Sequence, residues 1–492
     1  MGLTPKIDYV CPGERHPISR AVHLARLAAF YPACRDCPCR GDTGGLPPQT
    51  VRRLQSTERR VERASLFTAE GVRGVYLNEL NRRKAADLAA AFAALLWESA
   101  FETQRVRKIH NRQGLTDPDA AADAAAGLPP ALAHAFNSDW TRRARRARVA
   151  AVVAGHDERP SSPDLMAGVV ASLGRMGCEV IDIGLCTKPC FWFAVDHLQA
   201  AAGVFVTGSG CDASWTGLDF ALRGGTPLSR GVERREERFE LREDPKAHRP
   251  RPMGSLVSDL PSLEERLRRP VNRPTRHGGV RRSFCAAVPY EAALWKHFHA
   301  LRPLVVCLGC PVPLIRRTLE RLFATLPGRL VIVEAPAAQR IAAAVRRENA
   351  HLGVLIDDDG QRCTFLDERG RPVPPVDVLR LVSAMRLSDQ PGRAVAVESP
   401  DLPILHTPIR CAGGTAIDGG TTRAEMSQAM RSAEALLGGG SSGRFWLREG
   451  FPACDAIVSL ALVLQALSVS ELPFSLVAAD GRPALADSLA TR

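Results

Sequence analysis

The hydrophobic positions of this chain alternate between two kinds of spacing. Short continuous apolar runs occupy residues 147–155, 179–184 and 201–209, which read as buried strands. Apolar residues at helical spacing lie between these runs, and the same alternation returns over 301–356 and again after residue 393. Because strands that alternate with helices form parallel sheets, the pattern predicts an α/β protein with mixed, mainly parallel sheets.

The pattern divides the chain into three consecutive α/β units after a small Cys-rich module. The first unit is expected to contain a helical insertion. Residues 83–102 in it are rich in Ala and Leu, which favour a helix. A charged, Pro-rich connection follows the first unit. The expected divisions are 1–60 (Cys-rich module), 61–222 (first unit), 223–282 (connection), 283–350 (second unit) and 351–492 (third unit).

Composition narrows the class of partner. The 492 residues suggest about three domains. The net charge of +12 favours an acidic partner, such as a phosphorylated small molecule, although Arg richness is also typical of a GC-rich genome. The basic run 141–150 reads as a solvated helix face, so nucleic acid is not expected as a partner. No apolar run reaches the ~18 residues of a membrane span, and the first residues lack a signal-peptide core. We therefore expect a cytoplasmic protein without membrane association.

The N-terminal module carries a cysteine cluster. Cys34 and Cys37 form a C-x-x-C pair, with Cys39 beside it and Cys11 more distant. Four such thiolates can close a tetrahedral zinc site, with His16 as an alternative fourth ligand. Free or redox-active thiols explain the same spacing, so both interpretations stay open.

A serine loop follows the strand that ends near residue 206. Ser209 lies between Gly208 and Gly210, and glycines let backbone N–H groups approach a phosphate closely. Side chains at strand ends are where α/β proteins place their chemistry. A simple turn serine is the alternative interpretation.

An acidic loop follows a second strand. Asp357, Asp359 and Gln361 alternate in it, so their oxygens are expected to converge on one cation while Asp358 points away. Such hard oxygen ligands suit Mg²⁺. Arg362 either orients a phosphate or pairs with an aspartate, and a solvated acidic turn is the alternative for the whole loop.

Together these motifs resemble those of the α-D-phosphohexomutases, the phosphoglucomutase/phosphomannomutase superfamily. The resemblance covers about residues 67–477. The matching segments, in order, are 67–74 (FTAEGVRG), 152–162 (VVAGHDERPSS), 206–220 (VTGSGCDASWTGLDF), 357–362 (DDDGQR) and 439–444 (GGSSGR).

The resemblance implies a fold of three phosphohexomutase-type domains and assigns roles to the motif residues. Ser209 would carry the phosphoryl group, with Arg73 and Arg362 as catalytic arginines. Ser209, Asp357, Asp359 and Gln361 would bind Mg²⁺. The sugar loop would contribute Ser442, Gly443 and Arg444 to bind a hexose phosphate.

Several family positions are altered. Gly210 and Cys211 replace His-Asn after the serine, Asp219 replaces a lysine and Gln361 replaces the third metal aspartate. Glu70 precedes GVRG in place of a small hydroxyl residue, while Gly440 and Arg444 replace the glutamate and histidine of the sugar loop. The family's C-terminal phosphate-binding domain is expected to be absent, and a partner chain or oligomer is one way to supply it.

Three functions are compatible with the sequence at this point. The first is a divergent phosphohexose mutase that moves a phosphoryl group between the 1 and 6 positions of a hexose phosphate through a phosphoserine and Mg²⁺. The alternative is a catalytically impaired sugar-phosphate-binding or regulatory protein on the same scaffold. A nucleic-acid or protein adaptor is a third class, and steep salt dependence of nucleic-acid binding would support it.

Overall fold

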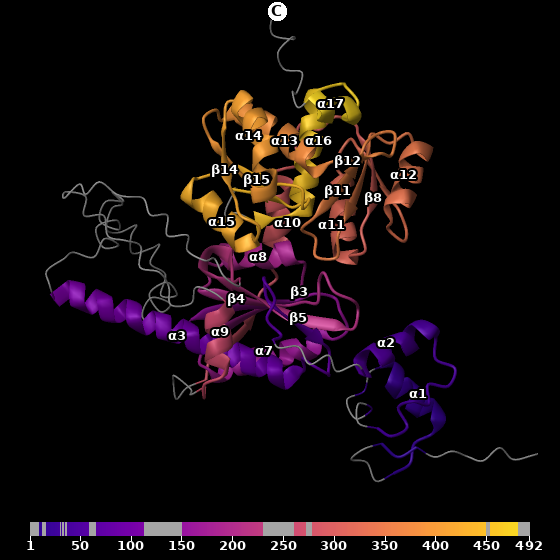
Figure 1. The fold of residues 1–492 in the computed structure, drawn as a ribbon, viewed down its shortest axis with the longest axis vertical. Helices are drawn as coiled ribbons and strands as arrows, with labels where there is room; N and C mark the ends of the chain where they lie inside the picture. The colour runs from indigo at the N-terminus through magenta and orange to yellow at the C-terminus, as the bar shows by residue number, and fades with distance from the viewer. Residues whose placement is uncertain are drawn as a thin grey trace, which may run out of the picture.

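Three mixed sheets, each with its own helices, follow one another along the chain in the computed structural model (Figure 1). None of the helices in the described residues has both the length and the apolar character needed to cross a membrane. The structure describes residues 9–11, 16–29, 31, 34, 37–58, 65–112, 150–229, 260–271, 278–448 and 453–480.

The first sheet has the order β1-β5-β4-β2-β3-β7, with β6 paired to β5. Its centre is parallel, whereas β5 runs antiparallel to both β4 and β1. Helices α3, α7 and α9 pack together on one side of it. The elements are β1 (Val72–Val75), α3 (Arg82–Arg112), β2 (Ala151–His156), α7 (Ser162–Arg175), β3 (Glu179–Leu185), α8 (Lys188–His197), β4 (Ala202–Val206), β5 (Trp215–Leu222), β6 (Thr226–Pro227), α9 (Leu260–Leu267) and β7 (Arg281–Ser283).

The second sheet has the order β12-β11-β10-β8-β9. Its parallel strands β9, β8 and β10 are continued by the antiparallel strands β11 and β12. Helix α12 packs on β8 and β10. The elements are α10 (Ala287–Trp295), β8 (Val305–Gly309), α11 (Pro313–Phe323), β9 (Arg329–Ile332), α12 (Ala338–Arg347), β10 (Leu352–Ile356), β11 (Cys363–Leu366) and β12 (Pro372–Val373).

The third sheet has the order β14-β13-β15-β16-β17 and the same plan, parallel on one side and antiparallel on the other. Helix α16 is buried on almost every side because its residues are nearly all apolar. The elements are α13 (Pro375–Asp389), β13 (Ala394–Val397), α14 (Leu402–Cys411), β14 (Thr415–Asp418), α15 (Arg423–Ser432), β15 (Leu437–Gly439), β16 (Phe445–Leu447), β17 (Ala453–Cys454), α16 (Ala456–Val469) and α17 (Phe474–Asp480).

The mixed α/β class is therefore confirmed, although antiparallel strands take a larger share of the sheets than we expected. Strand pairing also divides the chain differently. The division expected after residue 350 falls just before β10, which pairs with β8 and so belongs to the second sheet. Within the expected connection 223–282, β6 and α9 pack with the first unit, and β7 adds a strand to its sheet.

One large hydrophobic core joins the three units. It contains residues of α8 from the first unit, β8 and β10 from the second, and α13 and α16 from the third. Figure 1 accordingly shows α8 at the junction, facing the second and third units, with α3 on the far side of the first sheet. This junction holds the strand-end loops together, so it fixes the geometry of the site described next.

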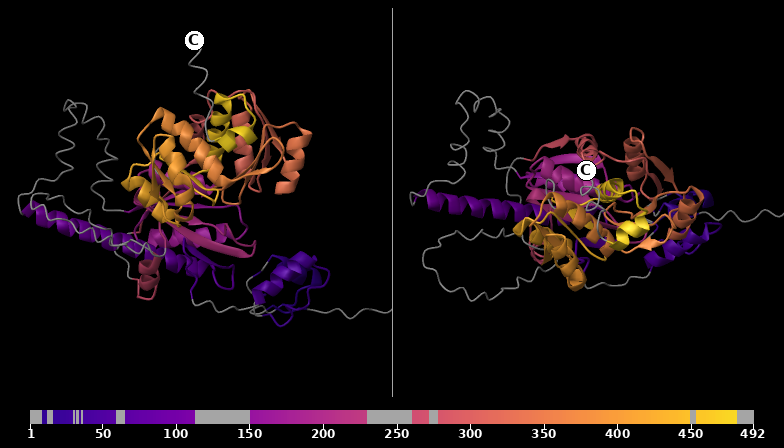
Figure 2. Two further views of the ribbon diagram at one scale, coloured as in Figure 1. Left: turned by 45° about the horizontal axis from the view of Figure 1, so that its top comes forward. Right: turned by 90° about the horizontal axis from the view of Figure 1, so that it is seen from above.

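The N-terminal helices α1 (Arg20–Ala28) and α2 (Pro48–Glu58) lie apart from the three sheets in Figure 1 and in the left view of Figure 2. Their small core contains Leu27, Cys34 and Leu54. Arg26 donates a hydrogen bond from Nη1 to the Sγ atom of Cys11 at 3.1 Å. Within the described residues, no three His, Cys, Asp or Glu side chains are grouped as they would be around a metal ion. The zinc site at Cys11, Cys34, Cys37 and Cys39 stays a prediction without structural support.

Candidate functional site

Ser209 occupies the loop between β4 and β5, at the carboxyl end of a parallel strand. Its side chain is buried, with the residue only 8% exposed. The hydroxyl of Thr207 accepts a hydrogen bond from the Ser209 amide at 3.0 Å, which fixes the start of the loop. Gly210 follows at φ +75°, a backbone region that favours glycine. The sequence thus holds the Ser209 hydroxyl inward, toward the junction of the units.

The acidic loop after β10 is a tight turn rather than an extended segment. Gly360 adopts φ +70°, and the backbone amide of Gln361 donates to both Asp357 Oδ1 and Asp359 Oδ1 at 3.0 Å. Asp357 and Asp359 are therefore adjacent, and the amide of Arg362 also donates to Asp357. Burial, together with the neighbouring charge of Asp359, raises the pKa of Asp357 to about 7.

Lys188 connects these two loops, although it belongs to none of the motifs in the sequence. Its ammonium nitrogen donates to the Ser209 hydroxyl at 2.7 Å and lies 3.2 Å from Asp359 Oδ2. The same nitrogen lies 3.0 Å from Asp219 Oδ2. The available signal was a charged residue that opens α8 among apolar neighbours, since a lysine buried there needs acidic partners.

Asp219 lies at the centre of a buried ion cluster. Besides Lys188, its carboxylate lies 2.6 Å from Arg73 Nη1 and 3.7 Å from Arg423 Nη2. Burial alone would raise the pKa of Asp219, but the three cations hold it well below its usual range. Arg423, at the start of α15, also lies 2.8 Å from Glu70 and donates to Gln361 Oε1 at 3.0 Å. The cluster therefore links all three units.

Arg159 and Asp358 tie the serine loop to the acidic loop from the other side. The Asp358 carboxylate accepts hydrogen bonds from Arg159 Nη2 at 3.1 Å and from the Gly210 amide at 3.2 Å. Arg159 also donates to the backbone carbonyls of Cys211 and Asp212. The expectation that Asp358 points away from the site was wrong. Side chains alternate only along an extended strand, and the turn at Gly360 removes that alternation.

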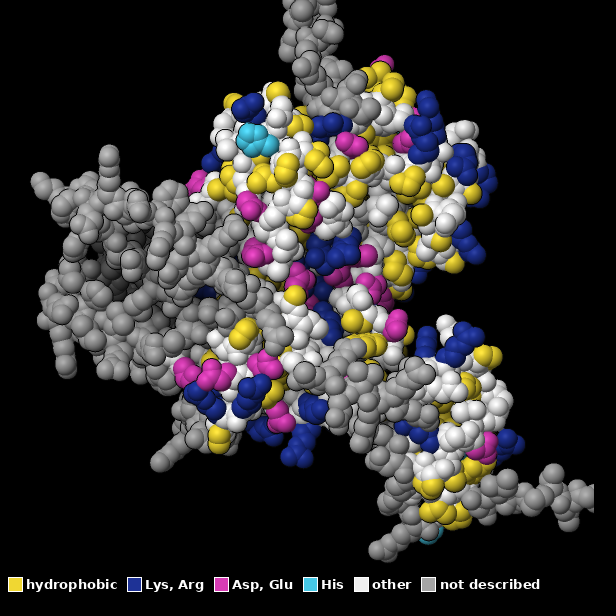
Figure 3. Space-filling view, in the orientation of Figure 1, with side chains coloured by type: hydrophobic (Ala, Val, Ile, Leu, Met, Phe, Trp, Pro, Cys, Tyr) yellow, Lys and Arg dark blue, Asp and Glu magenta, His cyan; other side chains and the backbone are white. Residues whose placement is uncertain are grey.

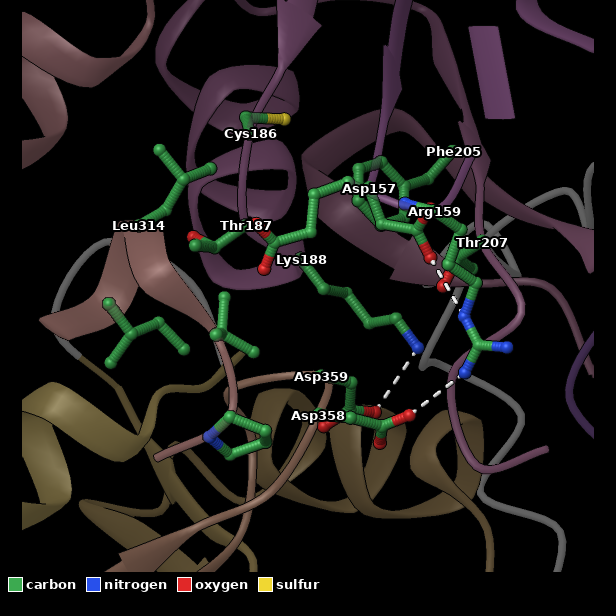
Figure 4. A pocket seen from close by; sticks show the side chains of 14 residues that line it. Asp157, Arg159, Cys186, Thr187, Lys188, Phe205, Thr207, Leu314, Asp358 and Asp359 are labelled. Carbon is green, nitrogen blue, oxygen red and sulfur yellow. Dashed lines mark hydrogen bonds and ion pairs between the residues drawn. The ribbon is translucent and has the colours of Figure 1, made fainter. Parts of the chain in front are cut away.

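A pocket of about 130 Å³ opens between the first and second units beside these contacts (Figure 4). In Figure 4, Lys188 and Arg159 reach from the first unit toward Asp359 and Asp358. Its lining also includes Thr187, Thr207, the acidic residues that follow β2 and apolar residues at the start of α11. Figure 3 shows Lys, Arg, Asp and Glu side chains gathered where the upper and lower parts of the molecule meet. This region is the candidate functional site.

The predicted sugar loop faces the same junction. Glu398 accepts hydrogen bonds from the Ser442 amide at 3.0 Å and from its hydroxyl, while Asp401 accepts from the Ser441 amide at 2.6 Å. A Cβ atom on Gly440 would lie within about 2.6 Å of both carboxylates, so a larger residue there would require these side chains to shift. Arg362 and Arg444 are paired backbone to backbone, which joins the acidic loop to the sugar loop.

The arginines predicted for the site differ in how far their guanidinium groups are already bound by other residues. The guanidinium of Arg73 is buried against Asp219 and the Val72 carbonyl, so it is committed to the ion cluster. Arg362 is exposed. Among the described residues, Arg444 has no hydrogen-bond partner at Nε, and its nearest carboxylate, Glu70, is 3.9 Å away. Arg444 is thus the predicted arginine best placed to receive an anionic ligand.

The arrangement does not fit the Mg²⁺ ion that the resemblance implies. The Lys188 ammonium already contacts Ser209 Oγ and Asp359 Oδ2, the two oxygens that a bridging ion would need. Backbone amides occupy Asp357 Oδ1 and Asp359 Oδ1, and Arg423 occupies Gln361 Oε1. Since Mg²⁺ requires close, near-octahedral oxygen ligands, it could not share this space with the ammonium.

Asp455 supports the acidic loop from behind. Its carboxylate caps α16 by accepting a hydrogen bond from the Ile457 amide. The amide of Ala456, directly after Asp455, donates to the Gly360 carbonyl. Tyr290 donates to the same carboxylate at 2.6 Å. Burial outweighs these hydrogen bonds and raises the pKa of Asp455 to about 6.

We expect Asp455→Asn to stabilise the protein at pH 8 by about 1–3 kcal/mol. Because the folded-state pKa is raised, the native state is favoured below about pH 4, and this contribution is lost as the pH rises through about 6. Asparagine is also a good helix N-cap, so the cap should survive. Urea unfolding at pH 4 and pH 8 measures the difference. A gain of equal size at both pH values would contradict the assignment.

Comparisons with known proteins agree with the fold and the motifs. A family model described as phosphoglucomutase/phosphomannomutase, alpha/beta/alpha domain I, matches residues 98–240. The chain is 28% identical over 355 residues to a protein of Xanthomonas campestris named phosphohexose mutases, covering 68% of this chain and 74% of that protein. It is 26% identical over 326 residues to a phosphomannomutase/phosphoglucomutase of Pseudomonas aeruginosa, covering 64% and 66%.

A solved structure shows the same fold. The crystal structure of a phosphoglucomutase/phosphomannomutase family protein from Burkholderia thailandensis superposes with a TM-score of 0.61. The match covers 84% of this chain and 78% of that one at 18% sequence identity. The comparisons confirm the resemblance that the motifs indicated: the chain is related to the α-D-phosphohexomutase superfamily and has its α/β fold.

Proposed function

We propose that this protein binds a hexose phosphate between its units and exchanges a phosphoryl group with Ser209, as a divergent phosphohexose mutase. One observation carries the proposal: the buried Ser209 hydroxyl lies at a strand end with a cationic nitrogen 2.7 Å away. A turn serine with a merely structural role would not need a buried ammonium as its partner. The names of the relatives support the same class of reaction.

The chemistry would proceed as a displacement at phosphorus. The Ser209 oxygen forms a bond to phosphorus while the bond from phosphorus to a sugar oxygen breaks, and the serine proton ends on the released sugar hydroxyl. In the opposite step the free hydroxyl of a hexose phosphate bonds to phosphorus as the bond from phosphorus to Ser209 oxygen breaks, and its proton ends on Ser209. The resulting 1,6-bisphosphate reorients and returns its other phosphoryl group to Ser209, so the phosphoryl group of the sugar has moved between positions 1 and 6. Such transfer relies on positioning and on charge neutralisation, so cations around Ser209 matter more than a strong base.

The third unit would hold the part of the sugar that does not react. Arg444 Nε has no hydrogen-bond partner within the part of the chain that the structure describes, and Ser442 and Gly443 lie beside Arg444 in a loop fixed by Glu398 and Asp401. A guanidinium matches the geometry of a phosphate and can bind it through two N–H groups. We assign Arg444 to the distal phosphate, with exposed Arg362, which pairs with it backbone to backbone, as a second cation.

Magnesium has no part in this proposal, because the residues present do not fit it. The arginine expected to be catalytic, Arg73, acts here through Asp219 by holding that carboxylate against Lys188. It is a positioning residue rather than a phosphate ligand. The acidic loop likewise positions Lys188 through Asp359.

The deciding experiment incubates the full chain with glucose 1,6-bisphosphate and with mannose 1,6-bisphosphate. Intact mass spectrometry is expected to show one added phosphoryl group, and peptide mapping is expected to place it on Ser209. Conversion of hexose 1-phosphate to hexose 6-phosphate should follow. A phosphoryl group on any other residue, or none with either sugar, would overturn the proposal.

A second function is favoured by the ion cluster. The buried cations and carboxylates around Asp219 neutralise one another, which leaves less positive charge to stabilise a phosphoryl group in transfer. In that case the protein would be a sugar-phosphate-binding or regulatory protein on the same scaffold. Calorimetric binding of hexose phosphate without any transfer to Ser209 would support this second function.

A further inference from the structure

The buried ammonium of Lys188 is in an unusual place for a lysine. It opens α8 directly after the N-cap Thr187, at the helix end where the backbone dipole disfavours a positive charge. The residue is only 3% exposed, so its charge has lost its water. A lysine held there must be stabilised by specific partners.

Three oxygens surround the ammonium group. Lys188 Nζ donates hydrogen bonds to Ser209 Oγ at 2.7 Å and to Asp359 Oδ2 at 3.2 Å, and it forms an ion pair with Asp219 Oδ2 at 3.0 Å. Ser209 and Asp219 belong to the first unit, and Asp359 belongs to the acidic loop of the second unit. Lys188 therefore bridges the serine loop and the acidic loop, which is the place that a metal ion would occupy.

The ion cluster also shows which residues hold the positive charge of Lys188 beside Ser209. Asp219 stands where the family pattern has a lysine, and here this anion lies between Lys188, Arg73 and Arg423. The positive charge beside Ser209 thus comes from residue 188, and residue 219 holds it in place.

We propose that the Lys188 ammonium replaces the divalent cation at this site and provides the positive charge that faces a phosphoryl group on Ser209. The identity of that phosphoryl group rests on the proposed function, whereas the replacement of the metal does not. The chain would then accept phosphate on Ser209 without a divalent metal.

Manganese binding tests the replacement directly, since Mn²⁺ reports binding by electron paramagnetic resonance without any sugar. The wild-type protein is expected to show no saturable Mn²⁺ site. Lys188→Ala frees oxygens of Ser209 and Asp359, and should bind Mn²⁺ at least about tenfold more tightly than wild type. Lys296→Ala, which removes an exposed lysine, should behave as wild type.

The outcomes separate the two proposals. One equivalent of Mn²⁺ bound by wild type and lost in Asp359→Asn would overturn the replacement, and this measurement decides even where Lys188→Ala does not fold. Incubation with the hexose bisphosphates in excess EDTA gives the second reading. Phosphate on Ser209 in EDTA supports the replacement, and phosphate only with Mg²⁺ overturns it. No phosphate under either condition overturns the proposed function alone.

Discussion

Asp219→Ala is expected to lower the free energy of unfolding by about 3–5 kcal/mol at neutral pH. The change leaves Arg73, Lys188 and Arg423 buried together without the carboxylate that they share. Each cation then keeps its desolvation penalty, and the three repel one another. Urea unfolding followed by circular dichroism measures the loss.

The pH dependence of this loss follows from the lowered pKa of Asp219. A carboxylate whose folded-state pKa is depressed contributes stability above its unfolded pKa of about 3.9, and that contribution is lost as the pH falls further. The difference between wild type and Asp219→Ala should therefore be full at pH 7 and should narrow below about pH 4.

Two comparisons distinguish the cluster from an ordinary ion pair. Glu265→Ala removes a carboxylate from an exposed pair with Arg269 and should cost at most about 1 kcal/mol. Asp219→Ala combined with Lys188→Met should destabilise less than the sum of the two changes, because the second removes a cation that the first leaves unpaired. Additive effects would mean that Asp219 and Lys188 do not interact as the structure shows.

The sequence located the two loops correctly because strand ends are local features. Ser209 and Asp357 each follow an apolar run, and the carboxyl ends of parallel strands are where loops of α/β proteins converge. The sequence did not show which strands pair in the same sheet. β10 follows a helix of the second unit, and nothing in its apolar letters says that it pairs with β8 rather than with later strands.

The ion cluster could not be found in this way. Lys188 and Asp359 are far apart along the chain, and Arg423 is more distant still. Their contacts depend on how the three units pack, and no local pattern of apolar and polar residues predicts that packing. Besides the charged residue at 188 among apolar neighbours, the altered family position at Asp219 was a visible sign, since an anion in place of a cation requires a compensating charge nearby.

Ser209→Ala is expected to abolish phosphoryl transfer while leaving the fold nearly intact. The variant removes the oxygen that would bond to phosphorus, so conversion of hexose 1-phosphate should fall to the uncatalysed level, a loss on the order of 10⁶-fold or more if the protein is an enzyme. Lys188 keeps Asp219 and Asp359 as partners, so stability should fall by only about 1–3 kcal/mol.

A control variant distinguishes the loss of phosphoryl transfer from a loss of stability. Ser383→Ala removes another buried hydroxyl, on α13 in the third unit, and should leave conversion unchanged. Coupled-enzyme assays give the rates, and urea unfolding gives the stabilities. Conversion that survives in Ser209→Ala would mean that the phosphoryl group never passes through Ser209. Rates at the uncatalysed level in wild type and variant alike, with hexose phosphate still bound, would favour the binding protein over the mutase.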